Sequence, residues 1–296
     1  MEFNLPIVTK YMIDKKIFWI ASYPKSGNTW VRAILSSLFF TEDGNFDFNY
    51  FKYIQLFEKS DQFNFVRNIN KNDHKNLSDF KILSKYWLKA QENLKIEEDF
   101  IFVKVHHACM KYFDNFFTTP DHSRGLIHIV RDPRDIAISY SHHRGCKIED
   151  TINLMQNGGF YPYVNQPPNQ LQGYLFPWDQ HVESWNRLQV PHLVIKYEDL
   201  LGDTKKSIFK IINFFKNNFK FKFKNLENKI DNIILTTSFK ELQNRENVTN
   251  FDEAPKNKTF FRKLTKCQQK NFEVKQLFMI LFNKTKLSVF VKKDCF

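Results

Sequence analysis

Residues 23–30 read YPKSGNTW, and they follow the apolar run IFWIAS at 17–22. The run predicts a buried strand, and residues 28–40 predict a helix. A turn between a strand and a helix presents free backbone N–H groups, and the N-terminus of a helix favours an anion. Within this turn Gly27 permits a curvature that a side chain would hinder, and Lys25 supplies a positive charge. The stretch is therefore a candidate phosphate-binding turn.

An ordinary turn with an exposed lysine is the alternative for the same stretch. The nucleoside-triphosphate loop GxxxxGK[ST] does not fit, because the second glycine is missing and the lysine precedes the glycine. The hydroxyl groups of Ser26 and Thr29 add further donors that an anion would use.

Strands and helices alternate along the rest of the chain. The patterns predict strands at 100–107, 125–132 and 192–200 (the last ending in a turn), helices at 84–94, 132–143, 178–188, in most of 204–246 and at 265–282, and a loop at 155–176. This order predicts an α/β fold with a mainly parallel sheet and helices on both faces. Ligands of such folds bind at the carboxyl ends of strands, and four residues fall at or just past such ends: Lys25, His106, Arg131 and Glu198.

The chain is strongly basic, with a formal net charge of +12, which suits a polyanionic ligand. Lysines are nevertheless scattered throughout, and the basic run at 216–229 alternates lysine with phenylalanine like a solvated amphipathic segment. No aromatic and basic RNA-binding signature accompanies it, so we expect no nucleic-acid partner. The four cysteines form no CxxC pair and match no zinc spacing, so we expect no metal site.

Length and hydropathy bound the organisation of the chain. No stretch of about 18 or more uncharged apolar residues occurs, which argues against a membrane span. Charged residues interrupt the N-terminal segment, so it lacks a secretory pattern and we expect a cytoplasmic location. No repeat, linker or composition break divides the sequence, and we expect one domain over residues 1–296.

Several segments occur together in an order that resembles the sulfotransferase family. YPKSGNTW is similar to the family's 5′-phosphosulfate loop, and IVRDPRDIAISY (129–140) resembles its 3′-phosphate-binding segment. KVHH (104–107) is similar to the family's Lys-Thr-His strand end, with Val105 in place of the threonine. WDQHVESW (178–185) and KYEDL (196–200) also occupy their family places.

The resemblance runs from about residue 17 to 262 and implies a cytosolic-type sulfotransferase domain. The implied fold has three α/β/α layers and a P-loop-like nucleotide site. Family members transfer a sulfuryl group from 3′-phosphoadenylyl sulfate (PAPS) to a hydroxyl or an amine, and they release adenosine 3′,5′-bisphosphate (PAP). The implied acceptor is a small molecule, a lipid or a carbohydrate, and no metal is required.

The resemblance also implies which residues hold the cofactor. The 5′-phosphate loop corresponds to Lys25, Ser26, Gly27, Asn28 and Thr29. The 3′-phosphate ligands correspond to Arg131 and Ser139, and an arginine fork suits phosphate oxygens. The positions near the adenine correspond to Trp30 and Tyr197, followed by Thr237, Ser238 and Phe239. The late cationic pair of the family corresponds to Arg262 and Lys263.

Some of these residues have plain structural alternatives. Core packing is an alternative role for Trp30. A surface salt bridge with Asp132 or Asp135 is the alternative role for the Arg131 guanidinium.

His106 corresponds to the family's catalytic base, which accepts the acceptor's proton as the acceptor oxygen attacks sulfur. A positioned base of near-neutral pKa contributes about 10²- to 10⁴-fold. Neighbours on a strand point to opposite faces, so only one of His106 and His107 can face the site, and the chemistry alone does not choose between them. Lys104 shares the face of His106, and Lys104 and Lys25 are the implied charge stabilisers.

One late segment departs from the family pattern. The family closes the 3′-phosphate site with a segment like Arg-Lys-Gly-x-x-Gly-x-Trp-Lys, but here FFRK (260–263) leads directly into LTKCQQKNFE. We interpret the Gly-rich part as deleted, because the last glycine is Gly202 and the last tryptophan is Trp185. Each charge-assisted hydrogen bond lost with it costs about 1.5–3 kcal/mol. A catalytically weakened or inactive nucleotide-binding relative is therefore an alternative function, and a P-loop nucleoside-phosphate kinase is a third.

The acceptor site is expected to be lined or covered by residues 43–75 and 147–176. Both segments are rich in phenylalanine, tyrosine and asparagine, which fits an aromatic, lipid or sugar acceptor equally.

Overall fold

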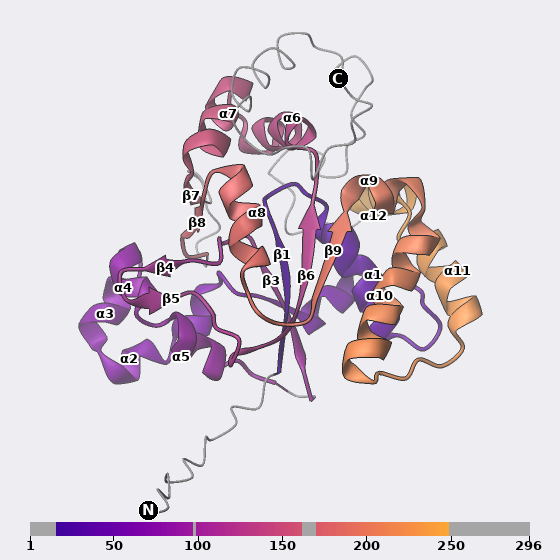
Figure 1. The fold of residues 1–296 in the computed structure, drawn as a ribbon, viewed down its shortest axis with the longest axis horizontal. Coiled ribbons are helices and arrows are strands. Elements are labelled where there is room, and N and C mark those ends of the chain that lie inside the picture. Colours follow the sequence, from indigo (N-terminus) through magenta and orange to yellow (C-terminus); the bar gives the residue numbers. More distant parts are fainter. Residues whose placement is uncertain (1–15, 97–98, 162–169, 249–296) are drawn as a thin grey trace, which may run out of the picture.

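Five parallel strands form the sheet at the centre of the structure, in the order β2-β3-β1-β6-β9 (Figure 1). The computed structural model describes residues 16–96, 99–161 and 170–248. The strands are β1 (Ile17–Ser22), β2 (Ile54–Leu56), β3 (Ile101–Val105), β6 (Ser123–Val130) and β9 (His192–Lys196). An α/β fold with a parallel sheet, as the sequence predicts, is confirmed.

The middle strand, β1, is where the order of the sheet reverses. Ile20 of β1 lies opposite Lys104 of β3 on one side and opposite Ile127 of β6 on the other. The chain fills the β3 side first and then crosses to the β6 side. In open parallel sheets, ligands bind beyond the carboxyl ends of the strands at such a reversal. The YPKSGNTW turn follows β1 directly, so the topology puts it at the expected ligand position.

Both faces of the sheet are buried, and its side chains alternate between two apolar clusters. Phe18 and Ile20 of β1 point into one cluster, whereas Trp19 and Ala21 point into the other. All four residues have no exposed surface. This explains why the strand reads as an unbroken apolar run rather than as an alternating one.

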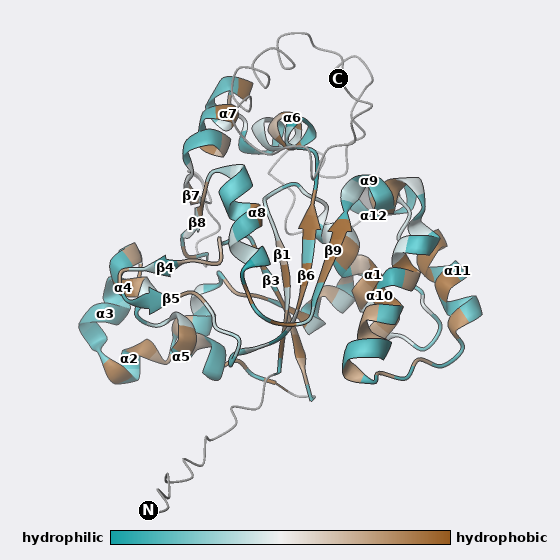
Figure 2. Cartoon of the chain, in the orientation of Figure 1, coloured by the Kyte–Doolittle hydropathy of each residue, from teal (hydrophilic) through white to brown (hydrophobic). Residues whose placement is uncertain are grey.

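The face that carries Phe18 is covered by the layer of helices α1 and α9–α12 (Figure 1). Their bounds are α1 (Asn28–Phe40), α9 (Tyr197–Gly202), α10 (Thr204–Phe219), α11 (Leu226–Thr236) and α12 (Phe239–Val248). The Phe18 ring meets Phe219 and Phe215 edge to face, at centroid distances of 4.8 and 5.1 Å. Figure 2 shows the apolar strands between helices whose colours change from one side of the helix to the other. The many phenylalanines of the chain therefore supply core material.

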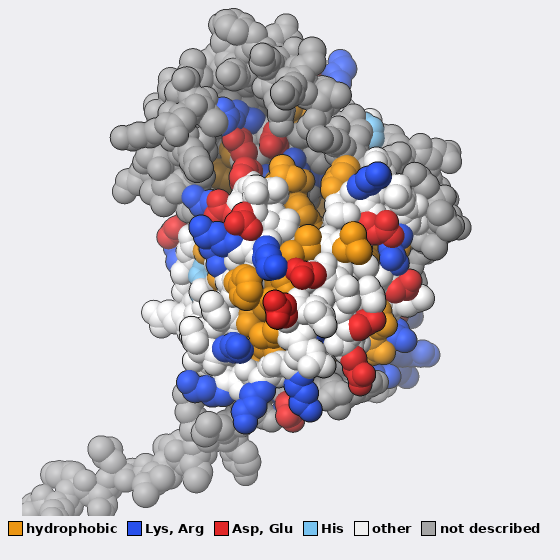
Figure 3. Space-filling model, turned by 90° about the vertical axis from the view of Figure 1, so that its right-hand side faces the viewer, with side chains coloured by type: hydrophobic (Ala, Val, Ile, Leu, Met, Phe, Trp, Pro, Cys, Tyr) orange, Lys and Arg blue, Asp and Glu red, His pale blue; other side chains and the backbone are white. Residues whose placement is uncertain are grey.

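The outer side of this layer mixes charged and apolar side chains (Figure 3). Leu201, Phe209 and Leu235 are exposed there. A shallow groove on the same layer is lined by Lys205, Phe209, Leu226, Glu227 and Ile230. None of the predicted site residues lines this groove.

The opposite face of the sheet is covered by short helices, by α8 and by a small hairpin. Their bounds are α2 (Val66–Ile69), α3 (Lys71–Lys75), α4 (Phe80–Ser84), α5 (Trp87–Glu92), α8 (Trp178–Asn186), β4 (Lys111–Tyr112) and β5 (Asn115–Phe116), with a 3-10 helix at Ser60–Phe63. A second 3-10 helix, Phe48–Tyr53, packs on the Phe18 face instead, through Phe48 and Phe51. Isolated helices of four to six residues are unstable, so contacts between side chains must stabilise the short helices of this layer.

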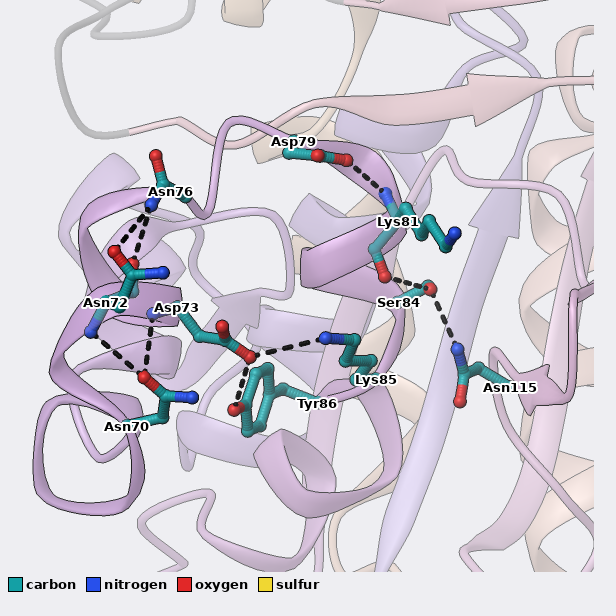
Figure 4. Close-up of polar contacts among 10 residues, drawn as sticks. All are labelled: Asn70, Asn72, Asp73, Asn76, Asp79, Lys81, Ser84, Lys85, Tyr86 and Asn115. Atoms are coloured by element: carbon teal, nitrogen blue, oxygen red, sulfur yellow. Dashed lines mark hydrogen bonds and ion pairs between the residues drawn. The ribbon is translucent and has the colours of Figure 1, made fainter.

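Polar contacts tie the short helices together (Figure 4). The Asn70 side chain accepts from the backbone N–H groups of Asn72 and Asp73 at the start of α3. The buried carboxylate of Asp73 accepts from the Tyr86 hydroxyl at 2.9 Å and lies 3.5 Å from the Lys85 ammonium. Asp73 therefore joins α3 to the segment between α4 and α5.

A third apolar cluster lies at the carboxyl edge of the sheet. It is built by α6 (Pro133–Arg144), α7 (Ile148–Asn157), β7 (Gly159–Tyr161), β8 (Gly173–Leu175) and α8. Tyr23, the first residue of the turn, packs in this cluster with Tyr140 and Trp178. The turn is thus supported from above by α6 and α8 (Figure 1).

Sequence patterns predicted the long elements closely and the short ones poorly. The strand at 17–22 and the helix at 28–40 are confirmed at their stated bounds. The predicted loop at 155–176 is wrong in part, because it contains β7, β8 and the end of α7. The helix predicted at 84–94 is also wrong in extent, since α4 ends at Ser84 and α5 begins only at Trp87. Three-residue strands such as β2 are too short to show a period.

Within the described ranges, no helix has both the length and the apolar character needed to cross a membrane. The helix predicted at 265–282 lies outside the described residues.

His107, the residue after the strand end, makes the fold sensitive to acid. Its ring is stacked between Phe117 and Phe80, at 4.5 and 5.5 Å. Burial lowers the pKa of His107 from 6.5 to about 4. As the pH falls, the unfolded chain therefore binds the proton first. The contribution of neutral His107 is fully present above about pH 6.5 and is lost toward pH 4, at about 1.4 kcal/mol per pH unit.

We predict that His107→Phe flattens this pH dependence. Between pH 7 and 4.5 the free energy of unfolding should fall by about 2 kcal/mol less in the variant than in the wild type. Urea unfolding at both pH values measures the difference. Parallel pH dependences in the two proteins would contradict it.

Candidate functional site

The turn after β1 adopts a left-handed backbone conformation at two of its residues. Lys25 and Gly27 both have positive φ, 66° and 103°, and the Ser26 N–H donates to the Tyr23 carbonyl at 3.2 Å. Ser26 is 1% exposed, and its hydroxyl has no hydrogen-bond partner among the described residues. A buried hydroxyl without a partner is costly, so this one is suited to a ligand.

The helix that follows the turn presents an uncapped N-terminus. Helix α1 begins at Asn28, and neither a capping side chain nor an acidic residue occupies its first turn. The Asn28 amide instead donates to the Ile20 carbonyl at 3.2 Å and to the Ser22 hydroxyl at 3.1 Å. This side chain therefore pins the helix to β1, and the first backbone N–H groups of α1 remain for an anion.

Gly27 is required by space as well as by conformation. A Cβ atom built on Gly27 would lie 2.6 Å from Cδ2 of Tyr197. Tyr197 begins α9, directly after β9, so its ring closes the turn from the other half of the sheet.

Arg131 joins the second predicted anion motif to the first. It follows β6, and its Nη1 donates to the Lys25 carbonyl at 3.0 Å. Its guanidinium carbon lies 4.1 Å from the centroid of the Tyr197 ring, and its Nη2 lies 3.7 Å from Asp135. The Nε atom is buried with no hydrogen-bond partner among the described residues. Two segments about a hundred positions apart in the sequence thus meet in one corner.

The helix after Arg131 starts where its capping residues place it. Asp132 accepts from the Arg134 N–H at 2.9 Å, and Pro133 is the first residue of α6. The Asp132 N–H donates to Glu198 at 2.8 Å, which ties β6 to α9. Burial raises the pKa of Glu198. Ser139 lies on α6 and is partly buried.

The residues implied at the adenine are divided between the corner and the core. Trp30 is 7% exposed, packs in the core, and meets the Tyr197 ring edge-on at 6.0 Å. Thr237 is fully buried, and its hydroxyl donates to the Ile233 carbonyl at the end of α11. Ser238 accepts from the Glu241 N–H, and Phe239 packs against the core. The structure brings Tyr197 to Trp30, whereas Thr237 and Ser238 are engaged in helix ends.

His106 lies at the end of β3, on the same side of the sheet as the turn. Its Nδ1 lies 2.8 Å from the Ser22 carbonyl oxygen and 3.2 Å from the Ser22 hydroxyl. A carbonyl only accepts, so Nδ1 carries the hydrogen and donates it, which leaves the lone pair on Nε2. His107 points to the other face and is 2% exposed, whereas His106 is partly exposed.

Positive charges surround the His106 ring. Burial and then the charge of Lys104 hold the pKa of His106 well below 6.5, and Arg32 and His181 act in the same direction. The hydrogen bond to the Ser22 carbonyl opposes them. Lys104 is 7% exposed, and its strand neighbours Val103 and Val105 both pack in the cluster that holds Trp19, on the other face. The imidazole is therefore neutral near pH 7, the form that can accept a proton.

Two further side chains hold the backbone of His106, and the sequence patterns did not single them out. The Glu58 carboxylate accepts from the His106 N–H at 2.9 Å, and His181 Nε2 donates to the His106 carbonyl at 2.9 Å. Glu58 follows β2, which was too short to predict. The place of His181 in WDQHVESW was the only signal for its proximity to the strand end.

Two predicted residues, Arg262 and Lys263, lie outside the described residues, as does the segment after them. Within the part of the chain that the structure describes, no group of three histidine, cysteine or acidic residues could hold a metal ion.

We predict that Gly27→Ala destabilises the protein by about 1–3 kcal/mol, because alanine is strained at this φ and its Cβ meets Tyr197. Gly202→Ala is the matched control, since nothing lies within 4 Å of a Cβ there. Urea unfolding measures both variants. Equal losses in the two would contradict the close approach of Tyr197.

Comparison with known proteins identifies a family. The sequence profile of the sulfotransferase domain matches residues 15–281. Sulfotransferase 1E1 of Homo sapiens is 25% identical over 249 residues, covering 80% of this chain and 69% of that protein. Sulfotransferase 1A1 of Bos taurus is 29% identical over 147 residues, 47% of this chain, and the match spans 43% of that protein.

Two solved structures share the fold. A mouse sulfotransferase, SULT7A1, complexed with PAP superposes with a TM-score of 0.52 at 18% identity, covering 93% of this chain and 86% of that one. Retinol dehydratase in a complex with retinol and PAP has a TM-score of 0.56 at 18% identity, covering 92% and 83%. Because the domain match covers most of the sequence and the architecture agrees, the chain belongs to the sulfotransferase family, the class of enzymes that transfer a sulfuryl group from PAPS.

Proposed function

We propose that this protein transfers a sulfuryl group from PAPS to a hydroxyl or amine of a small-molecule, lipid or carbohydrate acceptor. The observation that carries the proposal is the hydrogen bond from Arg131 to the Lys25 carbonyl, which brings both predicted anion motifs to the end of β1. The two solved structures with the same fold are complexes with PAP, which supports a nucleotide of this kind. We further propose that residues 1–296 act as one such domain in the cytoplasm.

The residues of the corner fit a nucleotide with separated phosphates. Ser26 offers a buried hydroxyl and α1 offers its uncapped N–H groups, which would hold the 5′-phosphate beside Lys25. The Arg131 Nε has no hydrogen-bond partner within the described ranges, and Arg131 together with Ser139 would hold the 3′-phosphate. The edge of Trp30 and the ring of Tyr197 would border the adenine. We assign weaker roles to Thr237, Ser238, Phe239, Arg262 and Lys263.

His106 would act as the general base. Its Nε2 carries the lone pair, and its low pKa keeps the ring neutral until a proton arrives from the acceptor hydroxyl. When bound, PAPS supplies the sulfuryl group and a phosphate leaving group. Lys25 would neutralise the charge that grows on the leaving oxygen, and Lys104 would stabilise charge on the group in transfer.

Aromatic side chains support an acceptor with apolar surface. Phe160 of β7 lies 5.0 Å from Phe80 of α4 and 5.0 Å from Tyr174 of β8. The Tyr161 ring lies 6.1 Å from the His106 ring. These rings come from the β7–β8 hairpin and from α4, beside the end of β3 that carries His106. We propose that they line the acceptor site. Retinol dehydratase, which shares the fold, holds an apolar ligand, retinol, in its solved complex.

The altered segment after Lys263 keeps a weakened or inactive nucleotide-binding relative as the second candidate. The nucleoside-phosphate kinase remains the third. Nucleotide binding and sulfuryl transfer to an acceptor distinguish both from the leading proposal.

Calorimetric titration with PAP, beside ATP, tests the nucleotide site. We predict that Lys25→Ala and Arg131→Ala each lose about 1.5–3 kcal/mol of PAP binding, roughly 10- to 150-fold in affinity. Lys205→Ala is the control, because Lys205 pairs with Asp231 on the distant α10–α11 layer. No PAP binding by folded wild-type protein would contradict the proposal, and a preference for ATP would favour the kinase.

Transfer of ³⁵S from labelled PAPS to a panel of phenols, steroid and fatty alcohols, sugars and aryl amines tests the chemistry. We predict that His106→Asn lowers turnover about 10²- to 10⁴-fold while PAP affinity is retained. Because the pKa of His106 is depressed, the acid limb of the wild-type kcat/KM profile should lie below pH 6.5. A protein that binds PAP and transfers to no acceptor would be the inactive relative.

A further inference from the structure

Glu58 is a buried carboxylate that touches both the catalytic strand end and the wall of the proposed acceptor site. It is 4% exposed, and its Oε1 accepts from the His106 N–H at 2.9 Å and from the Tyr161 hydroxyl at 2.5 Å. Its Oε2 is buried with no hydrogen-bond partner among the described residues. One oxygen atom therefore joins two segments that are 55 positions apart, at 106 and 161.

The backbone around Glu58 continues the same connection. The Glu58 carbonyl accepts from the Leu171 N–H at 2.7 Å, just before β8, and Lys59 forms a bridge with Gln170. On the other side of His106, the Ala108 N–H donates to the Tyr174 carbonyl at 2.9 Å. The β7–β8 hairpin is thus attached to the strand end on both sides of the histidine.

We propose that Glu58 is a positioning residue for sulfuryl transfer: its Oε1 sets the place of His106 and docks the Tyr161 wall of the acceptor site against it. This inference rests on the proposed function of His106. Glu58 lies outside every motif that the sequence analysis identified. Through its Oε1 atom, the position of His106 would depend on the position of Tyr161.

The energetics favour a role in position rather than in overall stability. A buried N–H or hydroxyl without an acceptor destabilises the fold, so the folded chain favours keeping both donors on Glu58. Hydrophobic residues would stabilise this site without an unpaired buried oxygen. Displacement of a catalytic group by about 1 Å lowers the rate by up to about 10²-fold. We therefore infer that the buried carboxylate serves to place His106 accurately.

Two neutral variants separate hydrogen bonding from charge. Glu58→Gln keeps an accepting oxygen for both donors, whereas Glu58→Leu keeps the approximate size and removes the acceptor. Tyr161→Phe removes one donor only. Asp73→Leu is the matched control, because Asp73 is also a buried carboxylate that accepts a tyrosine hydroxyl, in the layer of short helices (Figure 4).

The experiment is NMR of the full chain labelled with ¹⁵N-histidine, with the His106 resonances assigned by their loss in His106→Asn. Wild type, Glu58→Gln and Asp73→Leu should show the Nδ1–H tautomer and a depressed His106 pKa. Glu58→Leu should show mixed tautomers and at least about a tenfold higher proton affinity than Glu58→Gln, because a displaced ring regains contact with water. Tyr161→Phe should fall between the two.

Identical His106 titrations in Glu58→Leu and Glu58→Gln would overturn the inference. If Glu58→Leu does not fold, a Tyr161→Phe titration identical to that of wild type overturns it instead. PAP affinity, measured on the same samples, should stay within about twofold of wild type, since the proposed ligands Ser26 and Arg131 follow β1 and β6, whereas Glu58 is bonded to the end of β3 and to β7. Failure of the wild-type protein to bind PAP would reject the proposed function. The His106 titrations of the variants could still be compared, because they are measured without PAP.

Discussion

The site depends on one hydrogen bond, from the Arg131 guanidinium to the Lys25 carbonyl. β1 lies between β3 and β6, and the order of the sheet reverses at this strand. The three parallel strands end at the same edge, so the segments that follow them lie around one ligand position. The backbone of the turn is left-handed at Lys25 and Gly27, and in this conformation the Lys25 carbonyl accepts from Arg131. That geometry in turn requires the absence of a side chain at Gly27, against which the Tyr197 ring packs.

The charged side chains near the turn after β1 would favour a bound anion. Lys104 and the buried Arg32 both lower the pKa of His106, so the charges that would attract a phosphosulfate also keep the base neutral. An anion placed between them would offset the cations, and the proton affinity of His106 would rise as transfer begins. In the proposed mechanism, the ligand would therefore couple the proton affinity of His106 to the charges of Lys104 and Arg32. The structure achieves this with buried cations beside a partly exposed ring, rather than with an acidic partner on the imidazole.

Long, strongly patterned segments could be predicted from the sequence because local and tertiary preferences agree there. β1, its turn and α1 form one such unit, and strand alternation correctly put Lys104 and His106 on one face. Asn28 shows the limit: the loop motif implied a role at the 5′-phosphate, whereas in the structure its amide donates to Ile20 and Ser22 of β1. Glu58 and His181 could not be predicted as neighbours of the histidine, because their contacts join distant segments and leave no local period. The pairing of Glu58 with Tyr161 also requires β2 and β7, strands of three residues each.

The decisive experiment is a crystal structure of the protein grown with PAP. We expect the 5′-phosphate over the first turn of α1, within hydrogen-bond distance of the Ser26 hydroxyl, and the 3′-phosphate against Arg131. Density for the nucleotide at any other place, or in the reverse direction with its 3′-phosphate on the Lys25 turn, would show that the two anion motifs do not form the nucleotide site.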